Sequence, residues 1–230
     1  MPILYHHPAS AASRFARLVL GEIDFSAELV EERFWERHPD FLKLNPAGEL
    51  PVLVADNGYA FCGAHVIAEF LDEAHGVLKR DRRLLPEDPY KRAETRRLVD
   101  WFLDRMNQDV THPLLRERII KPQVPVTLGG GAPDSKVLRA ARANVRQYMR
   151  YLSWLAGSRP WLAGERLTYA DLAAAAAVSA LDYLGEIEWA ESPLAKEWYQ
   201  RMKSRPSFRP LLSDRMRNLA PVAHYADLDF

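Results

Sequence analysis

A proline at the mouth of a short apolar strand is the feature that most restricts the fold of this chain. Residues 45–53 read Asn-Pro-Ala-Gly-Glu-Leu-Pro-Val-Leu, so Pro51 follows a turn signal and precedes strand-forming residues. Proline cannot donate to a sheet ladder, and here it indicates an edge, a bulge or a cis turn. A cis bond would turn the backbone N–H and C=O of Leu50 outward as a pair, which makes Leu50 and Pro51 a candidate docking point for a peptide-like ligand.

Composition limits the class of protein. The chain has 230 residues, 48% of them hydrophobic, which is enough for one or two domains with a filled core. Its 31 basic and 31 acidic side chains balance, and without a long basic run we expect no nucleic-acid partner. The single cysteine, Cys62, cannot form an internal disulfide and fits a reducing compartment. With no secretory signal pattern and no membrane-length apolar run, we expect a cytoplasmic location and no membrane partner.

The hydrophobic pattern changes once along the chain. Up to about residue 78, short strand patterns (3–5, 27–30, 52–55 and 60–62) alternate with helix patterns (11–22 and 64–73). Residues 79–89 are charged and contain prolines, as expected of a linker. Beyond them the pattern is helical, with long helices predicted at 90–108 and 137–155 around a loop at 121–133. We therefore predict an α/β domain at 1–78, a linker at 79–89, an all-helical domain at 90–217 and a tail at 218–230.

Capping signals place the later helices. Thr168 followed by Asp171 forms a capping box that starts a helix over 169–181. The run Ala173–Ala177 has strong helix propensity and small side chains, so we expect this helix to be central and buried. Ser192-Pro193 and Arg205-Pro206 predict two further helix starts, because proline tolerates the first helical turn.

These segments in this order resemble the cytosolic glutathione transferase family over nearly the whole chain. The resemblance rests on Leu4-Tyr5, Ser10, Arg14 to Arg17, the proline-bearing segment 45–53, Leu167 to Asp171, and Arg205 to Arg209. It implies a thioredoxin-like N-terminal domain, a helical C-terminal domain and a two-fold homodimer with the active site near the cleft between domains. It also implies that the backbone of Leu50 stands where family members hold the cysteinyl part of glutathione.

Ser10 is the candidate for activating a glutathione thiol. It stands where serine-type family members keep the hydroxyl that favours the thiolate, near the start of a helix whose dipole helps an anion. It can equally be a plain N-cap serine. His6 and His7 occupy the neighbourhood where other classes place a tyrosine. Adjacent strand residues point to opposite faces, so these two histidines do not readily share a metal ion, and we expect no metal site.

The sequence departs from the family at Gly63 and Ala64. Family members that bind glutathione usually have an acidic or amide residue followed by Ser or Thr here, which pair with the γ-glutamyl ammonium and carboxylate. Neither Gly63 nor Ala64 has a polar side chain, and losing one such charged hydrogen bond costs about 1.5–3 kcal/mol. We therefore interpret Ser10, Leu50, Pro51, Gly63 and Ala64 as a vestigial glutathione site and expect no bound cofactor. Gly63 can also be a simple helix N-cap.

The tail is the second departure. It ends in Tyr225, Asp227, Leu228, Asp229 and Phe230, and in an extended chain the two aspartates would lie on one side and Leu228 and Phe230 on the other. That two-faced form is typical of a docking peptide, so we predict that these five residues bind a partner and contribute little to the fold. The alternative is a tail packed along its own domain, in which case the region of Trp35 and His38 is the next candidate.

The degraded site and this ending together resemble the glutathione-transferase-like bacterial division proteins that bind FtsZ. The resemblance implies a dimeric, non-catalytic adaptor at the division site that binds FtsZ filaments and modulates their curvature or bundling. Two alternatives stay open: a glutathione transferase or peroxidase that uses Ser10, and a general scaffold without FtsZ specificity.

Overall fold

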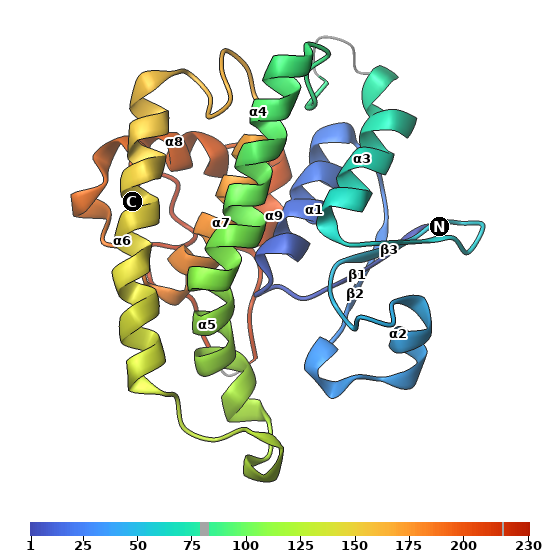
Figure 1. The fold of residues 1–230 in the computed structure, drawn as a ribbon, viewed down its shortest axis with the longest axis vertical. Coiled ribbons are helices and arrows are strands. Elements are labelled where there is room, and N and C mark those ends of the chain that lie inside the picture. The colour runs from blue at the N-terminus through green and yellow to red at the C-terminus, as the bar shows by residue number, and fades with distance from the viewer. Residues whose placement is uncertain (79–82, 218) are drawn as a thin grey trace.

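The computed structural model describes residues 1–78, 83–217 and 219–230, and has two parts that pack side by side (Figure 1). The first four residues of the predicted 79–89 linker, and Asn218 at the start of the tail, lie outside the described residues. The N-terminal part is a mixed sheet with three helices, and the C-terminal part is helical. Among the described residues, no helix is both long and apolar enough to cross a membrane.

The sheet has four strands in the order β2-β1-β3-β4. Its elements follow the chain as β1 (Ile3–His6), α1 (Ala11–Ile23), β2 (Glu28–Glu31), α2 (Pro39–Leu44), β3 (Val52–Val54), β4 (Ala60–Cys62) and α3 (Ala64–Ala74). β1 pairs parallel with β2 and antiparallel with β3, and β3 pairs antiparallel with β4. Figure 1 shows α1 and α3 on one side of the sheet and α2 on the other. All four predicted strands and both predicted helices are confirmed to within one residue at each end.

The helical part begins with a long rod. α4 (Pro89–Asp100) continues through π-helical turns and α5 (His112–Leu115) to Ile120. The remaining helices are α6 (Ser135–Ser158), α7 (Tyr169–Leu184), α8 (Pro193–Lys203) and α9 (Arg209–Leu212). The rod is longer than the predicted 90–108, because a π-helical stretch shifts the period that the sequence pattern follows. The predicted loop at 121–133 holds two 3-10 turns, Lys121–Gln123 and Val126–Leu128.

α7 is the centre of the molecule. Every one of its residues is buried, and the helix packs against α1, α4 and α8. The predicted capping box is present: Thr168 Oγ1 accepts from the backbone of the first turn, and Asp171 accepts from the backbone N–H of Thr168 at 3.0 Å. The alanine run lets neighbouring backbones approach closely, so the predicted central, buried helix is confirmed.

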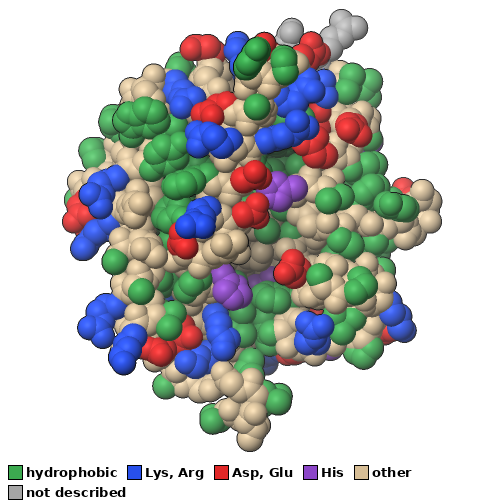
Figure 2. All heavy atoms as spheres, in the orientation of Figure 1, with side chains coloured by type: hydrophobic (Ala, Val, Ile, Leu, Met, Phe, Trp, Pro, Cys, Tyr) green, Lys and Arg blue, Asp and Glu red, His purple; other side chains and the backbone are tan. Residues whose placement is uncertain are grey.

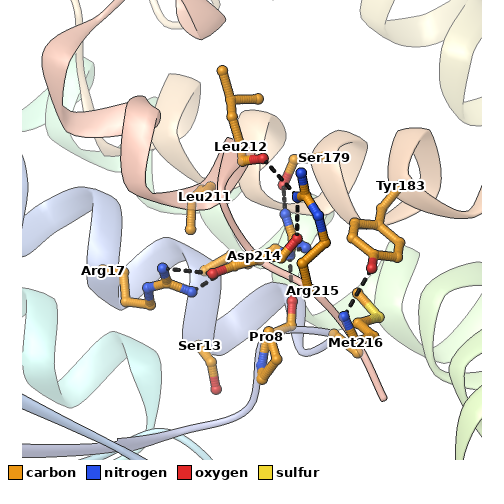
Figure 3. A network of polar contacts seen from close by, with 12 residues as sticks. Pro8, Ser13, Arg17, Ser179, Tyr183, Leu211, Leu212, Asp214, Arg215 and Met216 are labelled. Carbon is orange, nitrogen blue, oxygen red and sulfur yellow. Dashed lines mark hydrogen bonds and ion pairs between the residues drawn. The ribbon is translucent and has the colours of Figure 1, made fainter. Parts of the chain in front are cut away.

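A buried arginine joins the two parts. The Arg14 guanidinium, from α1, donates to Pro8 O at 2.6 Å, to Ser179 Oγ of α7 at 3.1 Å and to the Tyr225 hydroxyl at 2.7 Å. One turn later, Arg17 binds both carboxylate oxygens of Asp214, at 2.8 and 2.9 Å (Figure 3). These contacts tie the first helix to the central helix and to the segment that follows α9.

Candidate functional site

The predicted vestigial site lies in a cleft of about 310 Å³ between the two parts of the molecule. One wall comes from the start of α1, the turn before β3 and the start of α3, and it includes Ser10, Leu50, Gly63 and Ala64. The other wall is the rod that begins with α4. Figure 2 shows histidine and acidic side chains along the middle of this face. The structure therefore brings together four of the five residues that the sequence assigned to one site, and the fifth, Pro51, follows Leu50 without lining the cleft.

Ser10 is the N-cap of α1. Its Oγ accepts from the backbone N–H of Ser13 at 3.2 Å, so the plain capping role is confirmed. A hydroxyl that accepts as a cap keeps its own proton for donation. Because Ser10 also lines the cleft, capping and contact with a ligand are compatible uses of the same group.

The Leu50–Pro51 peptide bond is cis. Pro51 O accepts from the backbone N–H of Gly63 at 2.9 Å, which joins the two turns that form this wall. Asn45 holds the preceding segment, because its side chain donates to Glu49 O at 2.8 Å and accepts from Ala47 N at 3.2 Å. Within the described residues, the backbone N–H and C=O of Leu50 have no hydrogen-bond partner. This pair is available to a ligand in the cleft.

Gly63 and Ala64 contribute no polar side chain to the cleft. Gly63 precedes α3 as its N-cap with φ +94°, and a Cβ placed on it would meet nothing within 4 Å. The space that a larger side chain would occupy is open, but the positive φ strains any residue other than glycine. Ala64 is buried. At these two positions a charged ligand group finds only backbone partners, and the charged side chains that line the cleft lie at Glu49, His65 and Asp104.

The neighbouring His65 is already paired across the cleft. Its Nε2 lies 3.0 Å from Asp104 Oδ2 and its Nδ1 lies 3.7 Å from Asp100 Oδ1. Over the parts of the chain that the structure describes, these three residues form the one group of His, Cys, Asp or Glu ligand atoms within 4.8 Å of one another. All three side chains are substantially exposed, and each imidazole nitrogen has its own carboxylate. The arrangement is an interdomain contact of one imidazole with two carboxylates, with a hydrogen bond between His65 and Asp104.

Sequence reasoning missed the polar groups on the rod wall. Asn107, Thr111 and His112 line the cleft, and Thr111 Oγ1 donates to Asn107 Oδ1 at 2.7 Å. Burial is the main cause that lowers the pKa of His112; Arg116 lowers it further, and Glu49 opposes both. The available signal is the i, i+4 spacing of Asn107 and Thr111, which places both on one side of a helix if the pattern predicted at 90–108 is extended by one turn.

His6 and His7 are buried behind the cleft rather than in it. His7 Nδ1 accepts from Ala9 N at 3.2 Å, and its ring meets the Trp35 ring edge-on at 5.1 Å. Burial is the first cause that lowers the pKa of both histidines to about 4; Arg17 adds to it at His6, and His6 adds to it at His7. Both imidazoles are neutral at ordinary pH. Trp35 is half-buried, whereas His38 is exposed.

The tail does not have the form that the sequence suggested. Tyr225 is fully buried, and its hydroxyl accepts from Arg14 and donates to Leu211 O at 3.0 Å. The Phe230 ring packs against the Trp189 ring, with centroids 5.1 Å apart. The prediction that the tail contributes little to the fold is therefore wrong for Tyr225 and Phe230, since burying aromatic rings outweighs leaving them in water.

The tail is also not extended. Asp227 N donates to His224 O at 3.0 Å, and Asp229 N donates to Asp227 Oδ1 at 3.0 Å, so the chain turns twice in six residues. Asp227, Leu228 and Asp229 are exposed together. The expected separation of aspartates from apolar residues fails because alternation sorts side chains only in a straight chain.

Comparison with known proteins shows which family has this architecture. Models of the glutathione S-transferase N-terminal and C-terminal domains match residues 4–82 and 107–206. The chain belongs to the glutathione S-transferase family. It is 42% identical to FtsZ-localized protein A of Caulobacter vibrioides, over 99% of this chain and 97% of the relative. The predicted fold class, a thioredoxin-like domain followed by a helical domain, is confirmed.

Solved structures of relatives agree over the full length. FzlA from C. crescentus superposes with a TM-score of 0.91 at 41% identity, covering 100% of this chain and 99% of that one. A structure described as a glutathione S-transferase from Sinorhizobium meliloti 1021 superposes with a TM-score of 0.98 at 66% identity, covering both chains completely. The similarity therefore includes the tail as well as the two domains.

Proposed function

We propose that this protein is a non-catalytic, glutathione-transferase-like adaptor that binds FtsZ filaments and modulates their curvature or bundling at the bacterial division site. Support comes from the full-length similarity to FtsZ-localized protein A and from the matching structure of FzlA. Both extend through the tail, where the chain presents an exposed acidic turn.

The proposal that the protein is non-catalytic rests on the lack of polar side chains at Gly63 and Ala64. A γ-glutamyl group bound there would lose the side-chain partners of its ammonium and carboxylate. At about 1.5–3 kcal/mol for each charged hydrogen bond, two losses weaken binding by a few orders of magnitude. The free backbone N–H and C=O of Leu50 can still bind the cysteinyl part of glutathione. The γ-glutamyl part has no corresponding side-chain partners at positions 63 and 64.

Dimerisation would allow one particle to bind two filaments at once. A two-fold homodimer carries two identical partner surfaces, and a particle of this kind can bridge neighbouring filaments and gain avidity. The exposed residues Asp227, Leu228 and Asp229 are our candidates for the contact on each protomer. Recognition by a basic surface would make the affinity depend on salt, because exposed charges are screened.

The direct test is co-sedimentation with FtsZ polymerised in GTP, with unpolymerised FtsZ as control. We expect the protein to enter the pellet with filaments, and electron microscopy to show bundled or more strongly curved filaments. A fluorescent fusion should gather at midcell in dividing bacteria. Failure to pellet with filaments at micromolar concentration would reject the proposal.

A glutathione transferase or peroxidase activity is the second candidate. Ser10 at the start of α1 and the unpaired Leu50 backbone favour it, and so does the 66% identity to a structure described as a glutathione S-transferase. Its test is conjugation of glutathione to 1-chloro-2,4-dinitrobenzene and reduction of cumene hydroperoxide. Activity that disappears in Ser10→Ala while the fold is retained would establish this candidate.

A further inference from the structure

We propose that the tail presents a preformed turn for partner binding, built on two charges buried in the helical core. This inference rests on the proposed function and assigns the roles within that surface. Asp227, Leu228 and Asp229 contact the partner. The positioning residues, which do not contact the partner, are Lys203, Asp182, Tyr225 and Phe230.

Lys203 holds the turn from inside. This α8 side chain is fully buried, and its Nζ donates to His224 O at 3.4 Å and to Asp227 O. The two carbonyls are the two ends of the turn, so one ammonium fixes both. Its third neighbour is aromatic: Nζ lies 4.2 Å from the centroid of the Phe230 ring. A buried lysine needs such partners to stay charged, and the tail supplies three of them.

Asp182 of α7 holds the turn from the other side. Its carboxylate is fully buried and accepts from Trp189 Nε1 at 3.0 Å and from the Tyr199 hydroxyl at 3.2 Å, and its Oδ1 lies 2.9 Å from His224 Nε2. The His224 ring then stacks on the Phe230 ring, with centroids 5.0 Å apart and planes 17° apart. A hydrogen-bonded carboxylate in the core thus orients the first residue of the turn.

The entry to the turn is fastened separately. Val222 N donates to Tyr183 O at 3.3 Å, and the Tyr225 ring meets the Tyr183 ring at 5.0 Å. The Tyr225 hydroxyl lies in the Arg14 network described above. The chain is therefore fixed before, within and after the three exposed residues, which leaves those residues little freedom to lose on binding.

This arrangement specifies the partner surface. Two carboxylates flank Leu228, whose side chain is 38% exposed, within three consecutive residues. The complement is an apolar contact beside basic side chains on a folded protein. A fixed epitope binds more tightly than a disordered one with the same contacts, because the ordering cost has already been met in folding. Positions remote from the partner then control its affinity.

The first test compares a synthetic peptide of residues 219–230 with the full chain as competitors for FtsZ filaments. We expect unlabelled full chain to displace labelled protein and the peptide to fail at a hundredfold excess. A peptide that competes as well as the full chain would overturn the preformed turn while leaving FtsZ binding intact. A full chain that never pellets would instead reject the proposed function.

The second test removes the buried cation. Lys203→Met should weaken co-sedimentation at least tenfold at temperatures well below its melting transition. Lys196→Met is the matched control on the same helix: the Lys196 ammonium lies 4.9 Å from the Phe230 ring centroid but has no hydrogen bond to the described tail residues 219–230. It should bind as the wild type does. Phe230→Ala is the second positioning variant, in case Lys203→Met does not fold.

A third measurement is independent of FtsZ. Hydrogen exchange followed by mass spectrometry should show protection of residues 222–227 in the wild type, because the amides of Val222, Tyr225 and Asp227 donate to backbone carbonyls. Lys203→Met or Phe230→Ala should raise exchange there at least tenfold and leave α7 unchanged. Exchange at the unprotected rate in the wild type would overturn the inference whatever the partner is.

Discussion

Replacing Arg14 by methionine tests whether a buried polar network, rather than apolar contact alone, holds the two domains together. Arg14 has no exposed surface, and methionine has a similar length without the charge. The substitution removes the donors to Pro8 O, Ser179 Oγ and the Tyr225 hydroxyl. The serine and the tyrosine keep other partners, but Pro8 O loses a 2.6 Å bond.

The expected cost follows from burial. Leaving the buried Pro8 O without its donor costs about 1–3 kcal/mol, whereas Asp214 keeps its pair with Arg17. The free energy of unfolding of a typical domain is about 5–15 kcal/mol, so this loss is a large fraction of the total. For a chain of this size, about 1 kcal/mol lowers the melting temperature by roughly 2–4 °C. We therefore expect Arg14→Met to melt several degrees below the wild type.

Urea unfolding followed by circular dichroism measures the loss, and Arg96→Met is the matched control. Arg96 of α4 also bridges the two domains, through bonds of 2.8 and 3.0 Å to Glu69 of α3, but both side chains are well exposed, at 51% and 38%. An exposed pair of this kind contributes under about 1 kcal/mol. If the two substitutions cost the same, or Arg14→Met costs under about 1 kcal/mol, the argument from burial is refuted.

Four further predictions follow from the structure. The free energy of unfolding should fall as pH drops from 6.5 to about 4, because the unfolded state there protonates His6 and His7 while the folded state, with their pKa values near 4, does not. At most this costs about 3 kcal/mol per histidine, and pH-dependent urea midpoints that stay flat would contradict it. Isothermal titration with glutathione should show no micromolar binding, and a low-micromolar Kd would refute our interpretation of Gly63 and Ala64. Light scattering should give about twice the chain mass, whereas a strict monomer removes the bridging argument. Asp227→Lys should reduce FtsZ co-sedimentation more than Asp227→Ala, since reversing a charge turns attraction into repulsion; equal effects would count against an electrostatic contact.

Much of the fold could be predicted because local signals agree with the tertiary structure. The capping box at Thr168 and the alanine run after it mark α7 without reference to any other segment. Strand bounds were equally clear, since the sheet strands are short and turn residues bracket them. The rod from α4 to Ile120 was underestimated, because its π-helical turns are favoured by packing against α6 and α7 rather than by a residue pattern.

The site divides in the same way. Ser10, Leu50 and Gly63 are marked by backbone chemistry that a single sequence displays: a cap, a proline and a glycine with positive φ. His112 and Thr111 lie on the opposite wall, more than forty residues further along the chain, and only the packing of the rod brings them there. The prediction of an extended tail was wrong because residues distant in the sequence determine its conformation. Its alternation of charged and apolar residues is visible in the sequence, but Lys203 and Asp182, which bend it, are not local to it.

The packing of α7 has a consequence for how this chain can diversify. Ala173 to Ala177 are all completely buried, so a larger side chain at any of the five would have to displace a neighbouring helix, at roughly 1–3 kcal/mol. Polar replacements fare worse, because the helix has no face toward water. Substitutions are therefore tolerated less in the central helix α7 than at the surface, which is the rim of the molecule. The exposed positions 227–229 lie on that rim, where new specificities can accumulate while the scaffold stays the same.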